Sequence, residues 1–376
     1  MKIGILTLPI VDNYGGILQA VALYRYLENQ GHDVVLIYKD NAHQQALWKK
    51  VVISCLLKIP FHDFKKIKTN AKKKQARPQL KSFHRPFIES QIAVISNDLF
   101  TKADLTNYVK KEGLEAVIVG SDQVWRKDYI SDLYYLSYFL DFVENPKVKR
   151  IAYAASFGKD HWEGQGDETV INRLLQSFNS VSTREASGAK VCRETFGYNY
   201  AEHVLDPTLL HDANFYLKEV IGDNDIENIK RTAMVTYVLD EALEKKKIID
   251  SVKTKINLSN ILHLKGFNAD KELFTVPQWL AAFAFSNFII TDSFHGMVFS
   301  ILFEKNFIVI ANHDRGLDRF ISLLTLLGLE DRLVTKHTDI EDLSLEAIDY
   351  NAVKLLLSRY KGESYAFLNT ALMEDE

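Results

Sequence analysis

The sequence predicts an α/β protein made of two doubly wound, Rossmann-like domains that face each other across a cleft. Three observations support this fold class. Strand-like apolar runs alternate with helix-like patterns along most of the chain, as in a parallel sheet covered by helices on both faces. Polar turns, several of them with glycine, follow many of the apolar runs. The length of 376 residues suits two domains better than one.

The first domain is expected over residues 1–211. Short apolar runs that end in polar turns predict buried strands, and apolar residues that recur every three or four positions predict helices. The expected strands are 2–7, 33–38, 116–119, 150–155, 180–183 and 203–205, and the expected helices are 17–29, 105–112, 169–179 and 187–195.

The second domain is expected over residues 212–345. It begins with a polar stretch, 212–231, that lacks clear periodicity and is interpreted as a connection. The expected strands are 233–239, 260–264, 287–290 and 307–310, and the expected helices are 241–252, 277–285, 293–303 and 317–327. A last helix pattern begins at about residue 346, so residues 346–376 are predicted to form a C-terminal helix with an acidic tail.

The composition is that of a globular protein in a reducing compartment. The two cysteines, Cys55 and Cys192, have neither metal-ligand spacing nor a disulfide pattern. The chain starts directly in a predicted strand without a signal-peptide pattern, and its apolar runs fall short of the roughly 20 residues that cross a bilayer. We therefore expect a cytoplasmic protein.

The charge is unevenly distributed, because residues 49–85 hold twelve Lys or Arg and one acid, Asp63. The segment is read as an insertion into the first domain. Basic and interleaved apolar residues fit a solvated helical insertion, and they also fit peripheral attachment to an anionic membrane surface. Nucleic acid is the least expected partner, because the rest of the chain is acidic and would be repelled.

The turn over residues 290–297 is the strongest candidate for a site. It follows a predicted buried strand, and Ser293 is a good N-cap for the helix that comes next. The free N–H groups and the dipole of that helix favour an anion, with His295 and Gly296 in the first turn. The alternative is an ordinary strand-to-helix turn with a polar cap.

Two turns of the first domain offer contacts for a ligand that carries hydroxyl groups. Asp12, Asn13, Tyr14 and Gly15 follow the first strand, but they lack the dinucleotide-binding fingerprint. The turn over residues 120–125 combines Ser121, Asp122 and Trp125, which could hydrogen-bond hydroxyl groups and stack on a sugar ring. In the alternative reading, Asp122 caps a helix and Trp125 belongs to the core.

Arginines at two further turns could bind anions. Arg184 follows the strand at 180–183 and could clamp a carboxylate or phosphate, or form an ion pair with Glu185 or Asp206. Asp206 itself, before Pro207, is expected to be structural. Asn312, Arg315 and Arg319 follow the strand at 307–310 and could lie beside the Ser293 turn. Neither a zinc cluster nor a Ser-His-Asp arrangement is evident.

The ordered set of these turns resembles the polysaccharide pyruvyl transferase family over roughly residues 1–330. The motifs that carry the resemblance are Asp12-Asn13-Tyr14-Gly15, Gly120-Ser121-Asp122-Gln123-Val124-Trp125, Ser182-x-Arg184-Glu185, Asp206-Pro207-Thr208 and Asp292-Ser293-Phe294-His295-Gly296. The resemblance implies a GT-B-like fold and transfer of a pyruvyl group from phosphoenolpyruvate to a sugar as a ketal. Many members carry an Arg before the His-Gly pair, and Arg315 or Arg319 is a candidate replacement here.

Under this resemblance the roles divide between the two domains. His295 and Arg184 are the expected catalytic residues, and the donor anion is expected on the C-terminal side, at Ser293, Gly296, Asn312, Arg315 and Arg319. The acceptor, a sugar of a surface polysaccharide or a lipid-linked precursor, is expected at the two N-terminal turns. Phosphoenolpyruvate is a co-substrate, and the scheme requires neither a metal nor another cofactor. The sequence does not fix the acceptor sugar.

Two other functions remain open from the sequence. The first is a sugar-nucleotide-dependent glycosyltransferase of the GT-B class, because an anion-binding helix N-terminus also suits a diphosphate. The second is a non-catalytic carbohydrate-binding partner in the same pathway. The presence of both His295 and Arg184 argues against the second, since binding alone would not need both.

Overall fold

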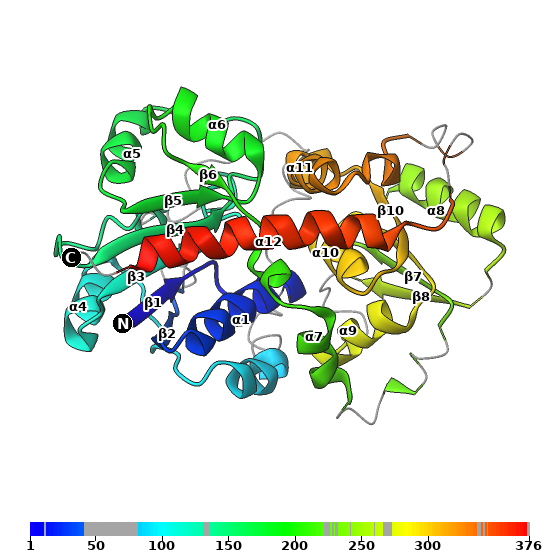
Figure 1. Cartoon of the computed structure of the whole chain (residues 1–376), viewed down its shortest axis with the longest axis horizontal. Coiled ribbons are helices and arrows are strands. Elements are labelled where there is room, and N and C mark those ends of the chain that lie inside the picture. Colours follow the sequence, from blue (N-terminus) through cyan, green and yellow to red (C-terminus); the bar gives the residue numbers. More distant parts are fainter. Residues whose placement is uncertain are drawn as a thin grey trace, which may run out of the picture.

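The computed structural model describes residues 1–10, 13–40, 82–130, 135–221, 226–227, 229, 232–240, 242–258, 260–265, 273–336, 340, 343 and 345–373. Two parallel sheets lie side by side along the long axis of the molecule (Figure 1). Almost all of the predicted segment 49–85 is outside the described residues, as are Asp12 and the last three residues of the acidic tail. The two-sheet α/β architecture predicted from the sequence is confirmed.

The N-terminal unit is built on a six-stranded parallel sheet in the order β2-β1-β3-β4-β5-β6. Its strands are β1 (Lys2–Leu6), β2 (Asp33–Ile37), β3 (Ala116–Gly120), β4 (Lys149–Ala155), β5 (Ser180–Thr183) and β6 (Glu202–His203). Its helices are α1 (Tyr14–Asn29), α4 (Lys102–Glu112), α5 (Glu168–Leu175) and α6 (Ala186–Glu194), with short 3₁₀ helices η1 (Tyr135–Phe139) and η2 (Pro207–Leu210).

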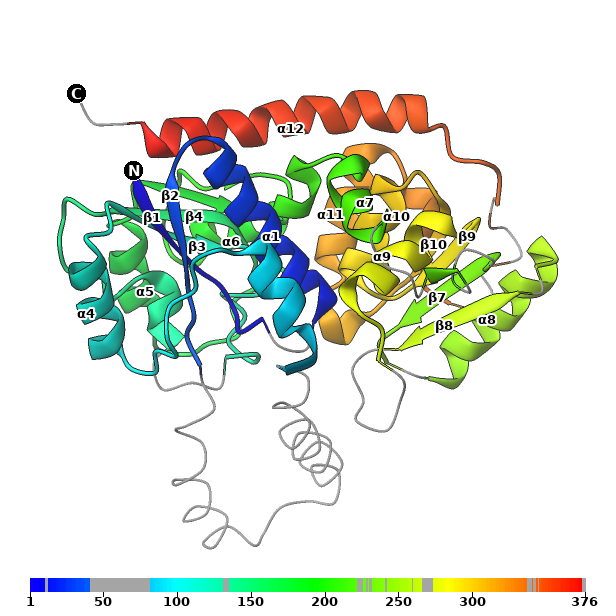
Figure 2. The same cartoon turned by 90° about the horizontal axis from the view of Figure 1, so that it is seen from below.

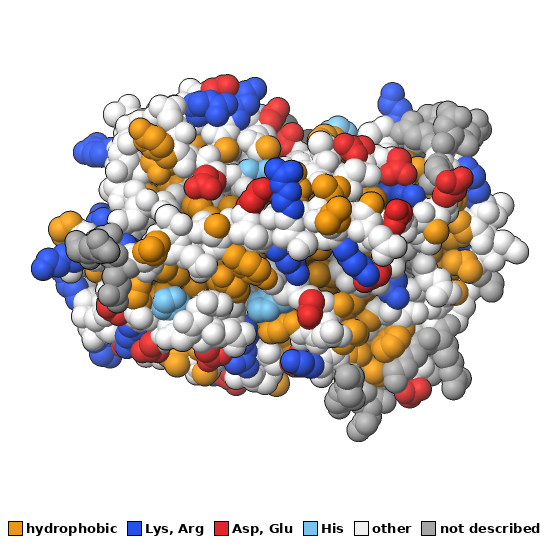
Figure 3. All heavy atoms as spheres, in the orientation of Figure 1, with side chains coloured by type: hydrophobic (Ala, Val, Ile, Leu, Met, Phe, Trp, Pro, Cys, Tyr) orange, Lys and Arg blue, Asp and Glu red, His pale blue; other side chains and the backbone are white. Residues whose placement is uncertain are grey.

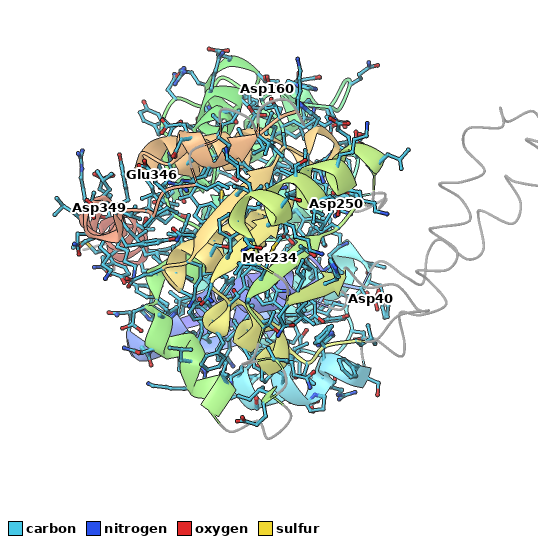
Figure 4. All side chains as sticks on the ribbon, turned by 90° about the vertical axis from the view of Figure 1, so that its right-hand side faces the viewer. Asp40, Asp160, Met234, Asp250, Glu346 and Asp349 are labelled. Carbon is cyan, nitrogen blue, oxygen red and sulfur yellow. The ribbon has the colours of Figure 1, made fainter. Side chains whose placement is uncertain are left out.

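The C-terminal unit is built on a five-stranded parallel sheet in the order β11-β10-β9-β7-β8. Its strands are β7 (Met234–Val238), β8 (Ile261–Lys265), β9 (Phe288–Thr291), β10 (Asn306–Ile310) and β11 (Leu333–Val334). Its helices are α7 (Ala213–Ile221), α8 (Leu243–Ile256), α9 (Val276–Phe285), α10 (Phe294–Leu302) and α11 (Asp318–Leu327), with η5 (His313–Arg315) and η6 (Glu330–Arg332). Figure 4 shows Met234 inside this unit and Asp250 of α8 toward its surface.

Burial on both faces of each sheet explains why the strands read as continuous apolar runs. Along β3, for example, Ile118 packs into one hydrophobic cluster, whereas Val117 and Val119 pack into another on the opposite face. The strand order reverses between β1 and β3 in the first sheet and between β7 and β9 in the second. In open α/β sheets, ligands bind outside the carboxyl ends of the strands at such a reversal.

The long helix α12 (Tyr350–Leu372) crosses both units (Figures 1 and 2). Near its start, the Tyr350 hydroxyl donates to the carbonyl of Lys305 at 2.5 Å, and near its end the Ser364 hydroxyl accepts from the backbone N–H of Leu205 at 3.0 Å. Figure 3 shows hydrophobic and charged side chains interspersed on this face of the molecule. The helix predicted from about residue 346 is thus confirmed, and it ties the two units together.

The structure corrects two expectations about secondary structure. The stretch at 212–231 was expected to be a connection, but it includes α7, in which Tyr216 and Val220 are buried one helical turn apart. The surrounding polar residues obscured that short apolar stripe in the sequence.

The first helix begins at Tyr14 rather than Ile17, because Tyr14, Gly15 and Gly16 are all buried and helical. The predicted domain boundary at 211–212 falls between the two sheets.

Candidate functional site

Four side chains from distant parts of the chain meet where the two units touch. Ser121 follows β3, Arg184 follows β5 and Asp206 follows β6, so all three lie at the carboxyl edge of the N-terminal sheet. His295 comes from the first turn of α10 in the C-terminal unit. We call these four residues the strand-end cluster, and all four are buried.

Asp206 is the centre of the strand-end cluster. One carboxylate oxygen accepts from the Ser121 hydroxyl and from Arg184, each at 2.9 Å, and the other accepts from the backbone and hydroxyl of Thr208 at 3.0 and 2.7 Å. Burial alone would raise the pKa of Asp206, but His295, Arg184 and Thr208 outweigh burial and hold this pKa well below its usual range. The carboxylate therefore stays ionised at any physiological pH.

Arg184 is a buried cation whose hydrogen-bond donors are only partly used. Its side chain is 1% exposed, and only Nη1 is hydrogen-bonded, to Asp206 and, at 3.4 Å, to Ser121. Nε and Nη2 are buried without a hydrogen-bond partner in the described part of the chain. The carboxylate of Asp122 lies 3.9 Å from Nη2, within reach of its charge but beyond a hydrogen bond. Unsatisfied donors of this kind are costly, so they indicate a missing acceptor.

His295 brings the C-terminal unit into contact with Asp206. Its Nε2 lies 3.5 Å from the Asp206 carboxylate and makes no hydrogen bond among the described residues. On its other side the imidazole fits against Gly15 of α1, where a Cβ would lie 2.0 Å from Nδ1. Gly15 is therefore required here for close approach, and it lets an α1 residue and an α10 residue touch across the two units.

The first turn of α10 has the predicted cap. The Ser293 hydroxyl accepts from the backbone N–H of Gly296 at 3.3 Å, which confirms Ser293 as the N-cap. A Cβ on Gly296 would lie 2.2 Å from the Thr291 hydroxyl oxygen, so this glycine permits the tight turn. Phe294 lies between the cap and His295, and the guanidinium carbons of Arg184 and Arg319 lie 4.6 and 5.4 Å from its ring centroid.

Arg315 and Asn312 belong to a second polar group, the Asp240 cluster. Arg315 forms a two-pronged ion pair with Asp240 at 2.5 and 2.9 Å. Asn312 donates to Asp240 at 2.9 Å and to Asp292 at 3.1 Å, and Lys245 pairs with Asp292 at 2.5 Å. Because these groups already satisfy one another, we no longer expect Arg315 and Asn312 to bind the donor.

The residues expected to contact a sugar are dispersed. Trp125 is completely buried, its ring stacks on Phe139 and its indole N–H donates to the carbonyl of Tyr138 at 2.8 Å. Its expected role in stacking on a sugar was therefore wrong for this structure, because the core occupies the ring. Asp122, by contrast, stays beside Arg184 with a backbone φ of 77°, a strained conformation that often marks functional sites.

The glycine-containing turn before α1 is only partly available. Tyr14 is buried, stacks on Trp279 with ring centroids 5.4 Å apart and donates its hydroxyl to the carbonyl of Phe274 at 2.6 Å. This residue thus joins α1 to the C-terminal unit rather than facing solvent. Asn13 is exposed at the N-cap of α1 and remains a predicted acceptor contact.

Sequence reasoning missed the importance of Asp206. It was expected to be structural, yet it contacts three other members of the strand-end cluster. Its position at a strand end, two residues before the hydroxyl of Thr208, was the available signal. Among the residues that the structure describes, no group of three or more His, Cys, Asp or Glu has the arrangement of a metal site.

The chain belongs to the polysaccharide pyruvyl transferase family, because the sequence model of that family matches residues 13–314. The matched range includes the whole strand-end cluster. No curated protein sequence matches the chain. The family assignment confirms the resemblance seen in the ordered motifs and makes the protein a member of a transferase family that modifies polysaccharides.

Solved structures share the two-unit fold at low sequence identity. The chain resembles MnaA of S. aureus, solved with UDP, at a TM-score of 0.53 and 12% identity, over 98% of this chain and 94% of that chain. It also resembles the UDP-GlcNAc 2-epimerase of Methanocaldococcus jannaschii at a TM-score of 0.52 and 13% identity, over 95% and 93%. The expected GT-B-like fold is therefore confirmed. Among the described residues, no helix is long and apolar enough to span a membrane.

Proposed function

We propose that this protein transfers the pyruvyl group of phosphoenolpyruvate to a sugar and forms a cyclic ketal. The observation that carries the proposal is the buried Arg184, whose Nε and Nη2 lack acceptors beside the N-terminus of α10. Phosphoenolpyruvate carries a carboxylate and a phosphate, and an arginine fork binds either in a two-pronged manner. The family assignment supports the same donor.

The reaction requires one proton transfer to carbon and the loss of phosphate. C3 of the donor accepts a proton and becomes a methyl group, C2 forms bonds to two sugar oxygens, and the bond between C2 and the phosphate oxygen breaks. Of the two hydroxyl hydrogens, one replaces the proton delivered to C3 and the other leaves with phosphate. Cations placed around the donor stabilise the charge of the departing phosphate.

His295 is proposed to move the proton, because imidazole titrates near neutrality and this ring lies beside both Asp206 and the helix N-terminus. Asp206 is proposed to hold the ring and to stabilise it when it is protonated. In the structure the side chains of both Arg184 and His295 are at most 7% exposed. The donor is therefore proposed to enter when the two units move apart, and the site closes around it.

Ser121 and Asp122 at the end of β3, together with Asn13, are proposed to face the acceptor. The acceptor is a sugar of a surface polysaccharide or of a lipid-linked precursor. The test is saturation binding with phosphoenolpyruvate and with a panel of sugar nucleotides, followed by detection of released phosphate and of the ketal methyl group by NMR. Tight binding of a sugar nucleotide without binding of phosphoenolpyruvate would favour a GT-B glycosyltransferase instead.

Peripheral attachment to the inner face of the membrane is proposed for the basic segment 49–85, on its composition alone. Each cation near an anionic surface contributes on the order of 1 kcal/mol, reduced by salt. Flotation with anionic vesicles at low salt should enrich the protein, and neutral vesicles or high salt should not. Equal recovery with and without anionic lipid would contradict the attachment.

A further inference from the structure

Arg319 of α11 differs from Arg315, the other arginine of the C-terminal unit that was considered for the site. It is 5% exposed, and its two hydrogen bonds go to backbone carbonyls, from Nη2 to Arg315 and from Nε to Gly316 at 3.4 Å. In the described part of the chain, no carboxylate lies within ion-pair distance of it. A cation that is buried on neutral carbonyls alone is unfavourable unless an anion joins it.

A second cation lies close by and increases that cost. Burial and the neighbouring positive charge of Arg184 lower the pKa of Arg319 to about 10, so it remains charged at neutral pH. The carboxylates of Glu185 and Asp122 attract Arg319 from beyond contact distance. One oxygen of Glu185 is already occupied by the Ser156 hydroxyl and by two backbone N–H groups. Attraction at a distance supplies no hydrogen bond, so in the described part of the chain the printed acceptors of Arg319 are the two neutral carbonyls of Arg315 and Gly316.

Phe294 explains how two like charges are held together. Both guanidinium carbons lie within 6 Å of its ring centroid, the range of a cation–π interaction. The ring is itself fixed edge-on by Phe320 of α11, with centroids 6.1 Å apart. Phe294 is thus a shared support for one arginine from each unit, at the first residue of α10.

We propose that Arg319 and Arg184, supported on Phe294, form one site between the two units for a dianion with phosphate chemistry. The two guanidinium groups approach the anion from different units, Arg184 from the end of β5 and Arg319 from α11, and the N-terminus of α10 contributes its dipole. The identification of this anion as the donor phosphate rests on the proposed function. Of the two candidates for the arginine that the resemblance places before the His-Gly pair, the proposal favours Arg319 over Arg315.

The experiment is calorimetric titration of the full chain with inorganic phosphate and with phosphoenolpyruvate. Arg319→Gln should weaken both about tenfold or more, the effect expected for loss of charge-assisted hydrogen bonds. Arg319→Lys should fall between Arg319→Gln and the unaltered protein, because the charge remains but the fork does not. Arg315→Gln removes the same charge four residues earlier in the chain, and it should change either affinity by less than about twofold because Asp240 already holds that side chain.

Thermal unfolding without ligand separates a binding role from a structural one. Arg319→Gln should leave the melting temperature unchanged or raise it, since a poorly compensated buried charge is removed. A large fall in melting temperature with unchanged phosphate affinity would overturn the proposal.

Phe294→Leu provides a second test of the site. This variant keeps an apolar side chain and both arginines, yet it should weaken phosphate binding by about threefold or more. Unchanged binding in both Arg319→Gln and Phe294→Leu would also overturn it.

The outcomes distinguish this proposal from the proposed function. Loss of phosphate affinity in Arg319→Gln, with no ketal formed by the unaltered protein from any sugar tested, would support the site and contradict pyruvyl transfer. Unchanged turnover of phosphoenolpyruvate and unchanged KM in Arg319→Gln would support pyruvyl transfer and contradict a binding role for Arg319. Failure of the unaltered protein to bind either anion would contradict both.

Discussion

The strand-end cluster and the Asp240 cluster lie at the carboxyl ends of the two sheets, and each combines an arginine with at least one carboxylate. In the Asp240 cluster two carboxylates, Asp240 and Asp292, face two cations, Lys245 and Arg315, and Asn312 links the carboxylates. In the strand-end cluster Arg184 uses one nitrogen and leaves two buried without acceptors. Both clusters share a position at a sheet edge, and the unsatisfied donors of Arg184 are the reason that the strand-end cluster is the proposed ligand site.

The comparison predicts that changes in the strand-end cluster reduce activity and that changes in the Asp240 cluster reduce stability. The largest effect is expected for His295→Ala, because the proposed proton transfer loses its carrier. Turnover should fall by about two to four orders of magnitude, measured as phosphate released from phosphoenolpyruvate in the presence of acceptor. His32→Ala is a matched control, since this half-buried histidine precedes β2 at the opposite edge of the N-terminal sheet from the cluster. A wild-type rate in His295→Ala would remove His295 from the chemistry.

Arg184→Lys is expected to have the next largest effect. Lysine can keep the ion pair with Asp206, but it cannot supply the planar fork that now points away from Asp206. The ratio kcat/KM for phosphoenolpyruvate should fall on the order of a hundredfold, while the melting temperature changes little. If stability dropped sharply and the kinetics stayed the same, the ion pair with Asp206 would be the whole role of Arg184.

Gly15→Ala tests whether the two units close as the structure shows. The new Cβ would fall on the imidazole of His295, so either the ring or α1 must move. Turnover should fall by about tenfold or more, because small displacements of a reacting group are costly. Gly16→Ala is the matched control: its Cβ would meet Asn13 at 3.4 Å, an ordinary contact. Equal activity of both variants would indicate that His295 and α1 do not approach each other during the reaction.

Asp240→Asn should have the smallest effect on activity, within about twofold, and a distinct effect on stability. Burial raises the pKa of Asp240, but hydrogen bonds from Arg315 and Asn312 and the Arg315 charge outweigh burial and lower the pKa to about 2. Because this value is below the ordinary value near 4, the pair stabilises the fold above about pH 4 and loses that contribution as the pH falls toward 2.

The pH dependence of unfolding checks that reasoning. The carboxylate is about half exposed, so the stability lost in Asp240→Asn at neutral pH should be about 1 kcal/mol or less. Denaturant unfolding at a series of pH values should show this difference between the two proteins shrinking below about pH 4. A difference that grew as the pH fell would contradict the assigned sign.

Local patterns allowed the fold to be predicted, whereas contacts between distant segments did not follow from them. The strand β9, the cap at Ser293 and the helix α10 were predictable because one continuous stretch contains both the apolar run and the capping residue. The short strand β11, with two residues, left no periodic signal. The strand end before Thr208 was a signal for Asp206, but its partners could not be predicted, because Ser121 and His295 are 85 and 89 positions away in the numbering.

The sequence also did not show which side chains are free to bind a ligand. Trp125 and Asp122 lie in one turn and were equally plausible as sugar contacts, but only the packing of Phe139 on the indole shows that Trp125 belongs to the core. Arg315 and Arg319 are four residues apart, and their sequence context gives no reason to separate them. Asp240, at the end of a strand far away in the sequence, pairs with Arg315 and leaves Arg319 to face Phe294.

The central claim is that the unsatisfied donors of Arg184 receive the donor anion, and a crystal structure of the protein with phosphoenolpyruvate tests it most directly. The account predicts a carboxylate or phosphate oxygen within about 3 Å of Nε or Nη2 of Arg184, with the methylene carbon near His295. Phosphoenolpyruvate bound at Arg315 in the Asp240 cluster, with Arg184 still holding only Asp206 and Ser121, would contradict the account.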